Sequence, residues 1–174
     1  MDIEQSLDLD SLPAFCQARV LVLGVGNILF GDDGFGPAVV ESLLRDYAIP
    51  DEIYVMDVGT GVRKLLFTLI LGDVLPNEIV IVDAVDWGHR IGEVKVISAD
   101  ELPATKIDDF SLHQVPTSNM LRELQDQCQV KVSVVVCDVG VLPQRIEPGL
   151  SPETTQAVQT ASRKIATQFS LEPL

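Results

Sequence analysis

The chain alternates between short apolar runs and longer stretches in which apolar residues recur every three or four positions. The runs are rich in branched residues and predict strands. The first and third runs have no polar break, which is typical of strands buried on both faces. The longer stretches predict helices. The expected strands cover residues 19–23, 52–57, 78–83 and 130–137, and the expected helices cover residues 35–47, 62–72, 115–128 and 151–169.

A fifth segment, residues 93–98, alternates between apolar and polar positions and therefore resembles an edge strand. It follows the third strand after a short turn, so we expect it to run antiparallel. Strands that alternate with helices form βαβ units, which build three layers around a mainly parallel sheet. The sequence predicts an α/β fold, a three-layer α/β/α sandwich of the phosphorylase/hydrolase-like kind. Its sheet is expected to have five strands, mainly parallel, with one antiparallel edge strand.

The chain is expected to form one domain. Its 174 residues are enough for a substantial core. Residues 1–18 are predicted to be an acidic N-terminal leader, and residues 19–174 a single domain. The last helix is predicted to begin at Ser151-Pro152-Glu153, which supplies an N-cap, a proline in the first turn and an early acid.

Charge and cysteine content restrict the classes of function. The formal net charge of -14 disfavours binding to nucleic acid and to anionic membranes. It suits a cation or a basic or neutral partner, although solubility alone would also account for it. The three cysteines form no close pair, which favours a reduced, cytoplasmic location. The longest apolar stretch, residues 65–71, is too short to span a membrane. We expect a monomer without a membrane segment.

Polar residues follow the predicted strands at their carboxyl ends, where ligands bind in open α/β sheets. His113 directly precedes a predicted helix whose start should lie on the same rim. Several carboxylates and one imidazole are therefore expected to converge on one crevice. The residues concerned are Asn27, Asp32, Asp33, Asp57, Asp83 and His113.

The loop GVGNILFGDDGFGP, residues 24–37, resembles a nucleotide-binding loop but fails both known fingerprints. Its glycines have the spacing GxGxxxxG, whereas a dinucleotide site needs GxGxxG, and no lysine follows Gly31 as a phosphate-binding loop requires. Two structural roles compete with a functional one. Asp32 is placed to cap the helix that begins near Phe35, and Asp33 is placed in the favourable field of that helix terminus.

Carboxylates packed in a concave site need a positive charge to offset them. A divalent cation would supply it, and a set of carboxylates with one imidazole suits zinc or nickel. A solvated polar rim is the alternative interpretation of the same residues.

Several motifs together resemble one family. They are LVLGVGNILFGDDGFGPAVVE, DVGTG, IVIVDAVDWG before GEV, and SLHQV, in family order and spacing from about Arg19 to Phe169. The chain is similar to the hydrogenase maturation endopeptidases, which remove the C-terminal extension of the large subunit of nickel–iron hydrogenases. The GDDGFGP form looks closest to members that serve coenzyme F420-reducing hydrogenase.

The resemblance implies that Asp33, Asp83 and His113 are metal ligands and that Asp57 is a further acid near the site. Many relatives carry Glu where this chain has Asp33, so the side chain that carries the carboxylate is one methylene shorter here. The implied metal is nickel supplied by the substrate precursor, with no tightly bound resident metal. Asp33 and Asp57 are the candidates for activating water. His89 is the alternative to His113 and is expected to be an exposed polar residue.

The resemblance also implies a loop surface over which the substrate approaches, formed by Gly26, Asn27, Gly59, Thr60 and Gly61. The implied function is cleavage of a hydrogenase large-subunit precursor after nickel insertion, with the bound nickel recognised. Three alternatives stay open: a chaperone that docks the precursor without cutting it, a peptidase with resident zinc, and a nucleotide-dependent enzyme. The failed fingerprints disfavour the last of these.

Overall fold

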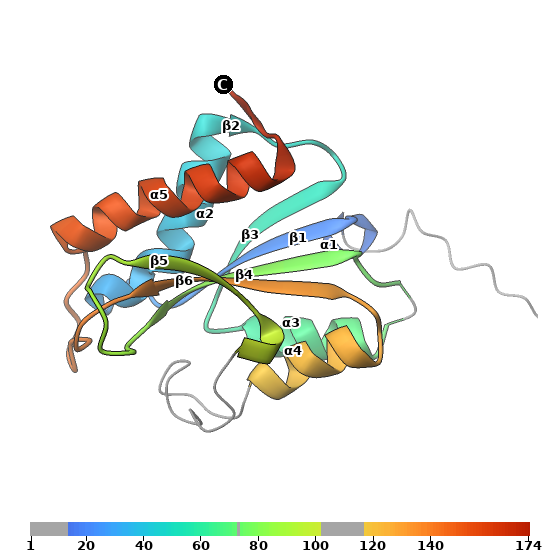
Figure 1. Ribbon diagram of the computed structural model, residues 1–174, viewed down its shortest axis with the longest axis horizontal. Coiled ribbons are helices and arrows are strands. Elements are labelled where there is room, and N and C mark those ends of the chain that lie inside the picture. The colour runs from blue at the N-terminus through green and yellow to red at the C-terminus, as the bar shows by residue number, and fades with distance from the viewer. Residues whose placement is uncertain (1–13, 73, 102–116) are drawn as a thin grey trace, which may run out of the picture.

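The computed structural model describes residues 14–72, 74–101 and 117–174. Its main sheet has five strands in the order β3-β1-β4-β6-β5 (Figure 1). β3, β1, β4 and β6 are parallel to one another, and the edge strand β5 is antiparallel to β6. The predicted fold class is confirmed. The strands are β1 (Val20–Val25), β3 (Ile53–Gly59), β4 (Glu78–Val85), β5 (Val94–Ser98) and β6 (Lys131–Asp138).

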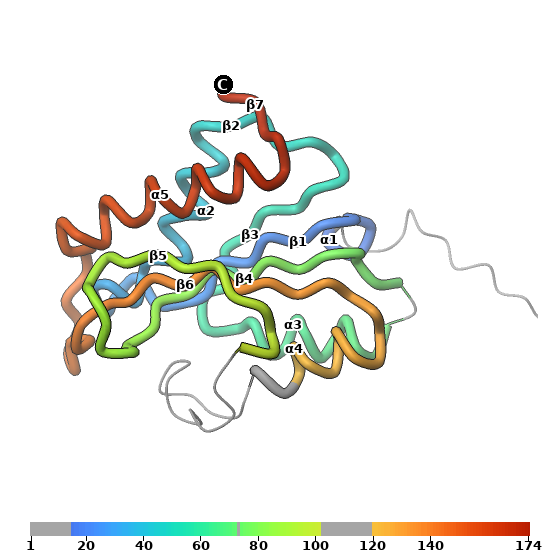
Figure 2. The backbone as a smooth tube through the Cα atoms, in the orientation of Figure 1, coloured from blue at the N-terminus to red at the C-terminus, as the bar shows by residue number. Residues whose placement is uncertain are grey.

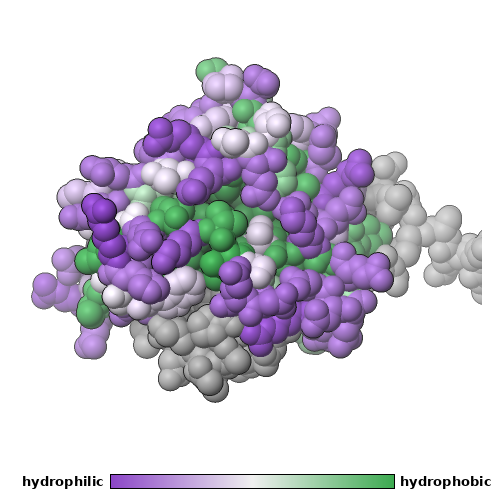
Figure 3. Space-filling view, in the orientation of Figure 1, coloured by the Kyte–Doolittle hydropathy of each residue, from purple (hydrophilic) through white to green (hydrophobic). Residues whose placement is uncertain are grey.

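Helices cover both faces of this sheet. α2 (Phe35–Asp46) and α5 (Pro152–Phe169) lie on one face, and α3 (Val62–Ile70) and α4 (Thr117–Asp126) lie on the other (Figure 1). Each face has its own apolar core, and alternate residues of β1 and β4 contribute to each. No helix in the described parts of the chain is long and apolar enough to cross a membrane. Hydrophilic residues cover most of the face shown in Figure 3, as the net charge leads us to expect.

The edge strand β5 is antiparallel as predicted, but its neighbour is β6 and not β4, the strand that precedes it in the chain. Burial explains this order. β4 is buried along seven of its eight residues and needs a strand on each side, whereas every residue of β5 is at least partly accessible. The long parallel strand β6 therefore occupies the place beside β4, and β5 closes the sheet.

Two glycines set the close approach of α2 to the sheet. A Cβ atom on Gly24 of β1 would lie 2.5 Å from the carbonyl oxygen of Gly36, and one on Gly36 would lie 2.2 Å from the carbonyl oxygen of Val25. Neither position has room for a side chain. This contact fixes the first turn of α2 against the end of β1, and with it the loop between them.

Several short elements were not predicted. Tyr47, expected in the helix over residues 35–47, instead begins β2 (Tyr47–Ala48), which pairs with β7 (Glu172–Pro173) near the C-terminus (Figure 2). The chain also forms a short helix α1 (Ala14–Gln17) and the 3-10 helices η2 (Gly31–Gly34) and η3 (Ala99–Glu101). The division into a leader and one domain stays a prediction.

The start of α5 is as predicted. Ser151 is the N-cap residue, its Oγ accepts a hydrogen bond from the backbone N–H of Thr154 at 3.2 Å, and Pro152 and Glu153 follow in the first turn. The helix ends where Ser170 adopts a left-handed conformation.

Candidate active site

Asp33 lies in η2, the 3-10 turn between β1 and α2, and its side chain points inward. Only 8% of the residue is exposed, and its Oδ2 accepts a hydrogen bond from the backbone N–H of Asn27 at 2.7 Å. Burial raises the pKa of Asp33, while the Asn27 hydrogen bond lowers it. The loop therefore folds back on itself and holds a carboxylate in a partly desolvated position.

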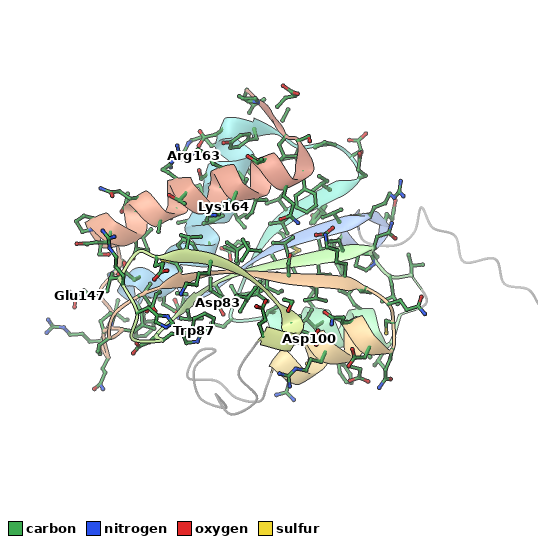
Figure 4. All side chains as sticks on the ribbon, viewed as in Figure 1. Asp83, Trp87, Asp100, Glu147, Arg163 and Lys164 are labelled. Carbon is green, nitrogen blue, oxygen red and sulfur yellow. The ribbon has the colours of Figure 1, made fainter. Side chains whose placement is uncertain are left out.

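Asp83 lies on β4 at the carboxyl end of the sheet, two residues before the strand ends. The residue is 3% exposed, and its Oδ1 accepts a hydrogen bond from the backbone N–H of Ala84 at 2.8 Å. Figure 4 places Asp83 toward the end of the sheet where Trp87 and Glu147 also lie. Burial raises the pKa of Asp83 well above its ordinary value, and the charge of Asp33 raises it further. The two carboxylates thus share one electrostatic environment.

The second oxygen of Asp83 has no stabilising partner in the described part of the molecule. Oδ2 is buried and accepts no hydrogen bond from any described residue. A buried carboxylate oxygen in this state is costly, and a second carboxylate nearby adds repulsion. A cation that reached both carboxylates would remove both costs. The arrangement is therefore suited to receiving positive charge.

The third ligand implied by the resemblance, His113, lies outside the described residues. Within the described residues, no group of three His, Cys, Asp or Glu side chains is placed to hold a metal ion. The ligand set of Asp33, Asp83 and His113 stays a prediction. The structure brings together the two of its members that it describes.

Asp57 lies on β3 and is exposed. Its Oδ1 accepts a hydrogen bond from the backbone N–H of Gly59 at 2.7 Å, which stabilises the turn that follows the strand. This turn also contacts the first loop, because the N–H of Gly26 donates a hydrogen bond to the carbonyl oxygen of Gly59 at 3.1 Å. The loop after β1 and the turn after β3 therefore lie side by side, and Asp57 is exposed to solvent next to them.

The residues predicted to guide the substrate have structural roles that the geometry explains. A Cβ on Gly26 would lie 1.9 Å from the carbonyl oxygen of Asp33, and its φ is +135, so this glycine makes room for the loop's own backbone. The Asn27 side chain accepts a hydrogen bond from the N–H of Leu29 at 3.1 Å. Thr60 and Gly61 are exposed. Contact with a substrate stays a prediction for these residues and for Gly59.

Asp32 does not cap α2, because that helix has no side-chain cap. Its two oxygens instead accept hydrogen bonds from the N–H and the Oγ of Ser151, at 2.6 and 2.8 Å. Asp32 thus ties the first loop to the N-terminus of α5. The hypothesis that Asp32 caps the helix beginning near Phe35 is therefore wrong.

One buried acid at the same edge was not predicted. Asp138 ends β6, is 4% exposed, and accepts hydrogen bonds from the backbone N–H groups of Trp87 and His89 at 3.4 and 2.9 Å. The His89 Nδ1 lies 3.3 Å from the same carboxylate. His89 is exposed as expected, but it is anchored by Asp138. Asp138 directly follows the predicted strand over residues 130–137, so the rule that points to acids at the carboxyl ends of strands applies to it as well.

Two of the described cysteines, Cys16 and Cys137, are unsuited to act as nucleophiles. Cys137 is fully buried, and burial together with the charges of Asp32 and Asp138 raises the pKa of its thiol to about 12. Burial also raises the pKa of Cys16. Both thiols stay protonated at neutral pH and are unreactive.

The fold and the site together define an α/β protein with a pair of buried carboxylates at the carboxyl edge of its sheet. The model of the family described as hydrogenase maturation protease matches residues 37–168. A Methanocaldococcus jannaschii protein provisionally named a hydrogenase maturation protease is 40% identical over 144 residues, which are 82% of this chain and 90% of that protein. The coenzyme F420 hydrogenase subunit delta of Methanothermobacter thermautotrophicus is 32% identical over 88% of this chain and 96% of its own length.

A solved structure shows the same architecture. The hydrogenase maturating endopeptidase HybD from E. coli superposes with a TM-score of 0.66 and 26% sequence identity, over 90% of this chain and 96% of its own. The chain therefore belongs to the hydrogenase maturation protease family, a family of endopeptidases. The family named from the sequence motifs is confirmed.

Proposed function

We propose that the chain removes the C-terminal extension of a nickel–iron hydrogenase large-subunit precursor after nickel has been inserted, and that it recognises the bound nickel. The observation that carries this proposal is the pair of buried carboxylates, Asp33 and Asp83, with one oxygen of Asp83 unpartnered among the described residues. Such a pair is unfavourable without a cation and favourable with one.

Nickel in this scheme is part of the substrate. Asp33, Asp83 and His113 would complete its coordination from the enzyme side, in a mixed oxygen and nitrogen set that nickel accepts. Binding would hold the adjacent peptide bond in a fixed place, and Asp33 or Asp57 would activate the attacking water. Cleavage would then depend on correct metal loading, because only a loaded precursor offers the cation.

The enzyme itself would carry no tightly bound metal and would act as a monomer in the cytoplasm. The first point follows from the proposed scheme itself, in which the precursor supplies the nickel. A resident zinc would instead keep both carboxylates ionised. Metal analysis of the purified protein checks this, with less than stoichiometric zinc and nickel as the expected result.

The precursor we propose belongs to a coenzyme F420-reducing hydrogenase. The 32% identity to the subunit delta of such a hydrogenase, over most of both chains, supports this choice. Precursors from this and from other nickel–iron hydrogenases, each loaded with nickel, would be compared as substrates. The F420-reducing enzyme's precursor should be cleaved fastest.

The main experiment follows the mass of a large-subunit precursor that has been prepared with and without nickel. The nickel-loaded precursor should lose its extension, and the metal-free precursor should stay intact. A precursor truncated at the end of the mature subunit serves as the control for unspecific proteolysis. Equal cleavage of both forms would overturn nickel recognition, and binding without any cleavage would favour the chaperone alternative.

A further inference from the structure

A cleft of about 740 Å³ opens beside the acidic crevice, between the first loop, α2 and the segment before α5. Its walls are mainly apolar. Three charged residues, Glu41, Arg45 and Asp57, stand among them. The apolar part of the lining consists of Ile28, Pro37, Ala38, Val40, Leu44 and Leu150.

The local sequence keeps this cleft open. Gly149 lines it without a side chain. Gly149 adopts a φ of +111, which disfavours any other residue, and a Cβ built there would meet nothing within 4 Å. Two large apolar side chains on the cleft are left in contact with solvent, because Ile28 is 60% exposed and Leu44 is 51% exposed. Exposed apolar side chains gathered in a hollow are typical of a binding site.

The cleft borders the turn that carries Asp33. Gly31 and Gly34 are the two ends of η2, the turn that carries Asp33, and both line the cleft. Asp57 forms part of the wall on the side of β3. A chain segment that leaves a metal held near Asp33 and passes Asp57 would therefore enter an apolar hollow directly.

We propose that this cleft binds an apolar side chain of the precursor segment that adjoins the metal. The inference rests on the proposed function, because it takes the precursor as the molecule in the crevice. It adds a substrate contact that does not depend on nickel. Recognition of the metal distinguishes a nickel-loaded precursor from a metal-free one, and the cleft binds the peptide next to the metal. The apolar walls select the chemistry of the side chain.

A second hollow offers a matched comparison. It has a volume of about 470 Å³ and is lined by Arg90, Glu93, Glu153 and Thr160 among others, so its character is polar. Thr160 lies on α5 and is half-buried, as Ala38 is on α2. The two positions can therefore carry the same large side chain, one in each hollow.

The test fills or trims the cleft at two positions that are not fully buried. Ala38→Phe occupies the hollow, Leu44→Ser removes part of its wall, and Thr160→Phe is the control in the polar hollow. With the nickel-loaded precursor, Ala38→Phe should lower kcat/KM by about tenfold to hundredfold, through a raised KM. Leu44→Ser should lower it in the same way by a smaller factor, and Thr160→Phe should leave it unchanged. Leu44→Ser carries the test if Ala38→Phe fails to fold.

The substrate side is tested by replacing each apolar residue around the scissile bond of the precursor with Ser, one at a time. One of these precursor replacements should lower kcat/KM about tenfold or more with the native enzyme. With the Ala38→Phe enzyme, the same precursor should be cleaved no more slowly than the unchanged precursor, because the cleft is already filled. Losses that multiply, or native kcat/KM for both cleft variants, would overturn the proposal. Equal cleavage of metal-free precursor would remove nickel recognition alone. If no precursor is cleaved, the same variants are compared by the Kd for precursor binding. A protein that binds the precursor through the cleft but does not cut it would contradict the proposed function and leave the cleft proposal intact.

Discussion

Asp33 raises the pKa of Asp83: the two carboxylates come from the turn after β1 and from the end of β4, and the charge of the first disfavours ionisation of the second. Burial is the larger cause. A chain that keeps two acids in this state loses folding stability at neutral pH. We interpret that loss as the consequence of a site made for a cation.

The pH dependence of stability tests this relationship. The pKa of Asp83 is raised on folding, so its charge costs stability above the ordinary pKa of about 3.9 and the cost grows until the raised pKa is passed. Asp83→Asn removes the charge and keeps an oxygen for the Ala84 N–H. The melting temperature of Asp83→Asn minus that of the native protein should therefore increase from pH 4 to pH 8. A difference that is flat or falls with pH would contradict the raised pKa.

Asp33 is tested by separating its charge from its hydrogen bond. In Asp33→Asn the amide oxygen still accepts the Asn27 N–H, so the melting temperature should be unchanged or slightly raised. Precursor cleavage should fall at least a hundredfold, because the charge that meets the cation is lost. Asp33→Ala leaves that N–H without its partner and should cost about 1–3 kcal/mol in the free energy of unfolding. Native cleavage rates for Asp33→Asn would exclude Asp33 as a ligand.

The two histidines are predicted to differ in role. His113→Ala should abolish cleavage with little change in melting temperature, because it removes one of three proposed metal donors. His89→Ala should leave cleavage within about twofold, since His89 is exposed and Asp138 keeps its hydrogen bonds from the backbone of the same turn. Both variants are compared with the native enzyme on nickel-loaded precursor. An inactive His89→Ala and an active His113→Ala would reverse the assignment.

The sequence predicts those residues of the candidate site whose position follows from a short segment of the chain. Asp33, Asp57 and Asp83 each follow or end an apolar run, so the rule that ligands bind at the carboxyl ends of parallel strands places them at one edge. Asp83 was also predicted to lie in a buried strand, which by itself implies a desolvated acid. Both features are properties of short segments and of their order in the chain.

Contacts between distant segments could not be predicted in this way. Ser151 is 119 residues from Asp32 in the chain, so no spacing rule connects the two. The order of β5 and β6 depends on which strand is buried more completely, which is a property of the assembled sheet. The cleft beside Asp57 is likewise formed by three separate segments that the fold brings together.

Asp32 is predicted to stabilise the fold without taking part in the reaction. Asp32→Ala removes both acceptors of Ser151, whose N–H and Oγ then lose partners at 2.6 and 2.8 Å, and should cost about 1–3 kcal/mol in the free energy of unfolding. Ser151→Ala should also be destabilising, by about 1 kcal/mol, because it removes the N-cap of α5. The two losses should not add in the double variant, since the residues share one hydrogen-bond network. The measurements are urea unfolding and precursor cleavage at a temperature where each variant is folded. Cleavage per folded molecule should stay within about twofold of the native rate. A variant that is fully stable but inactive would instead place Asp32 in the reaction beside Asp33.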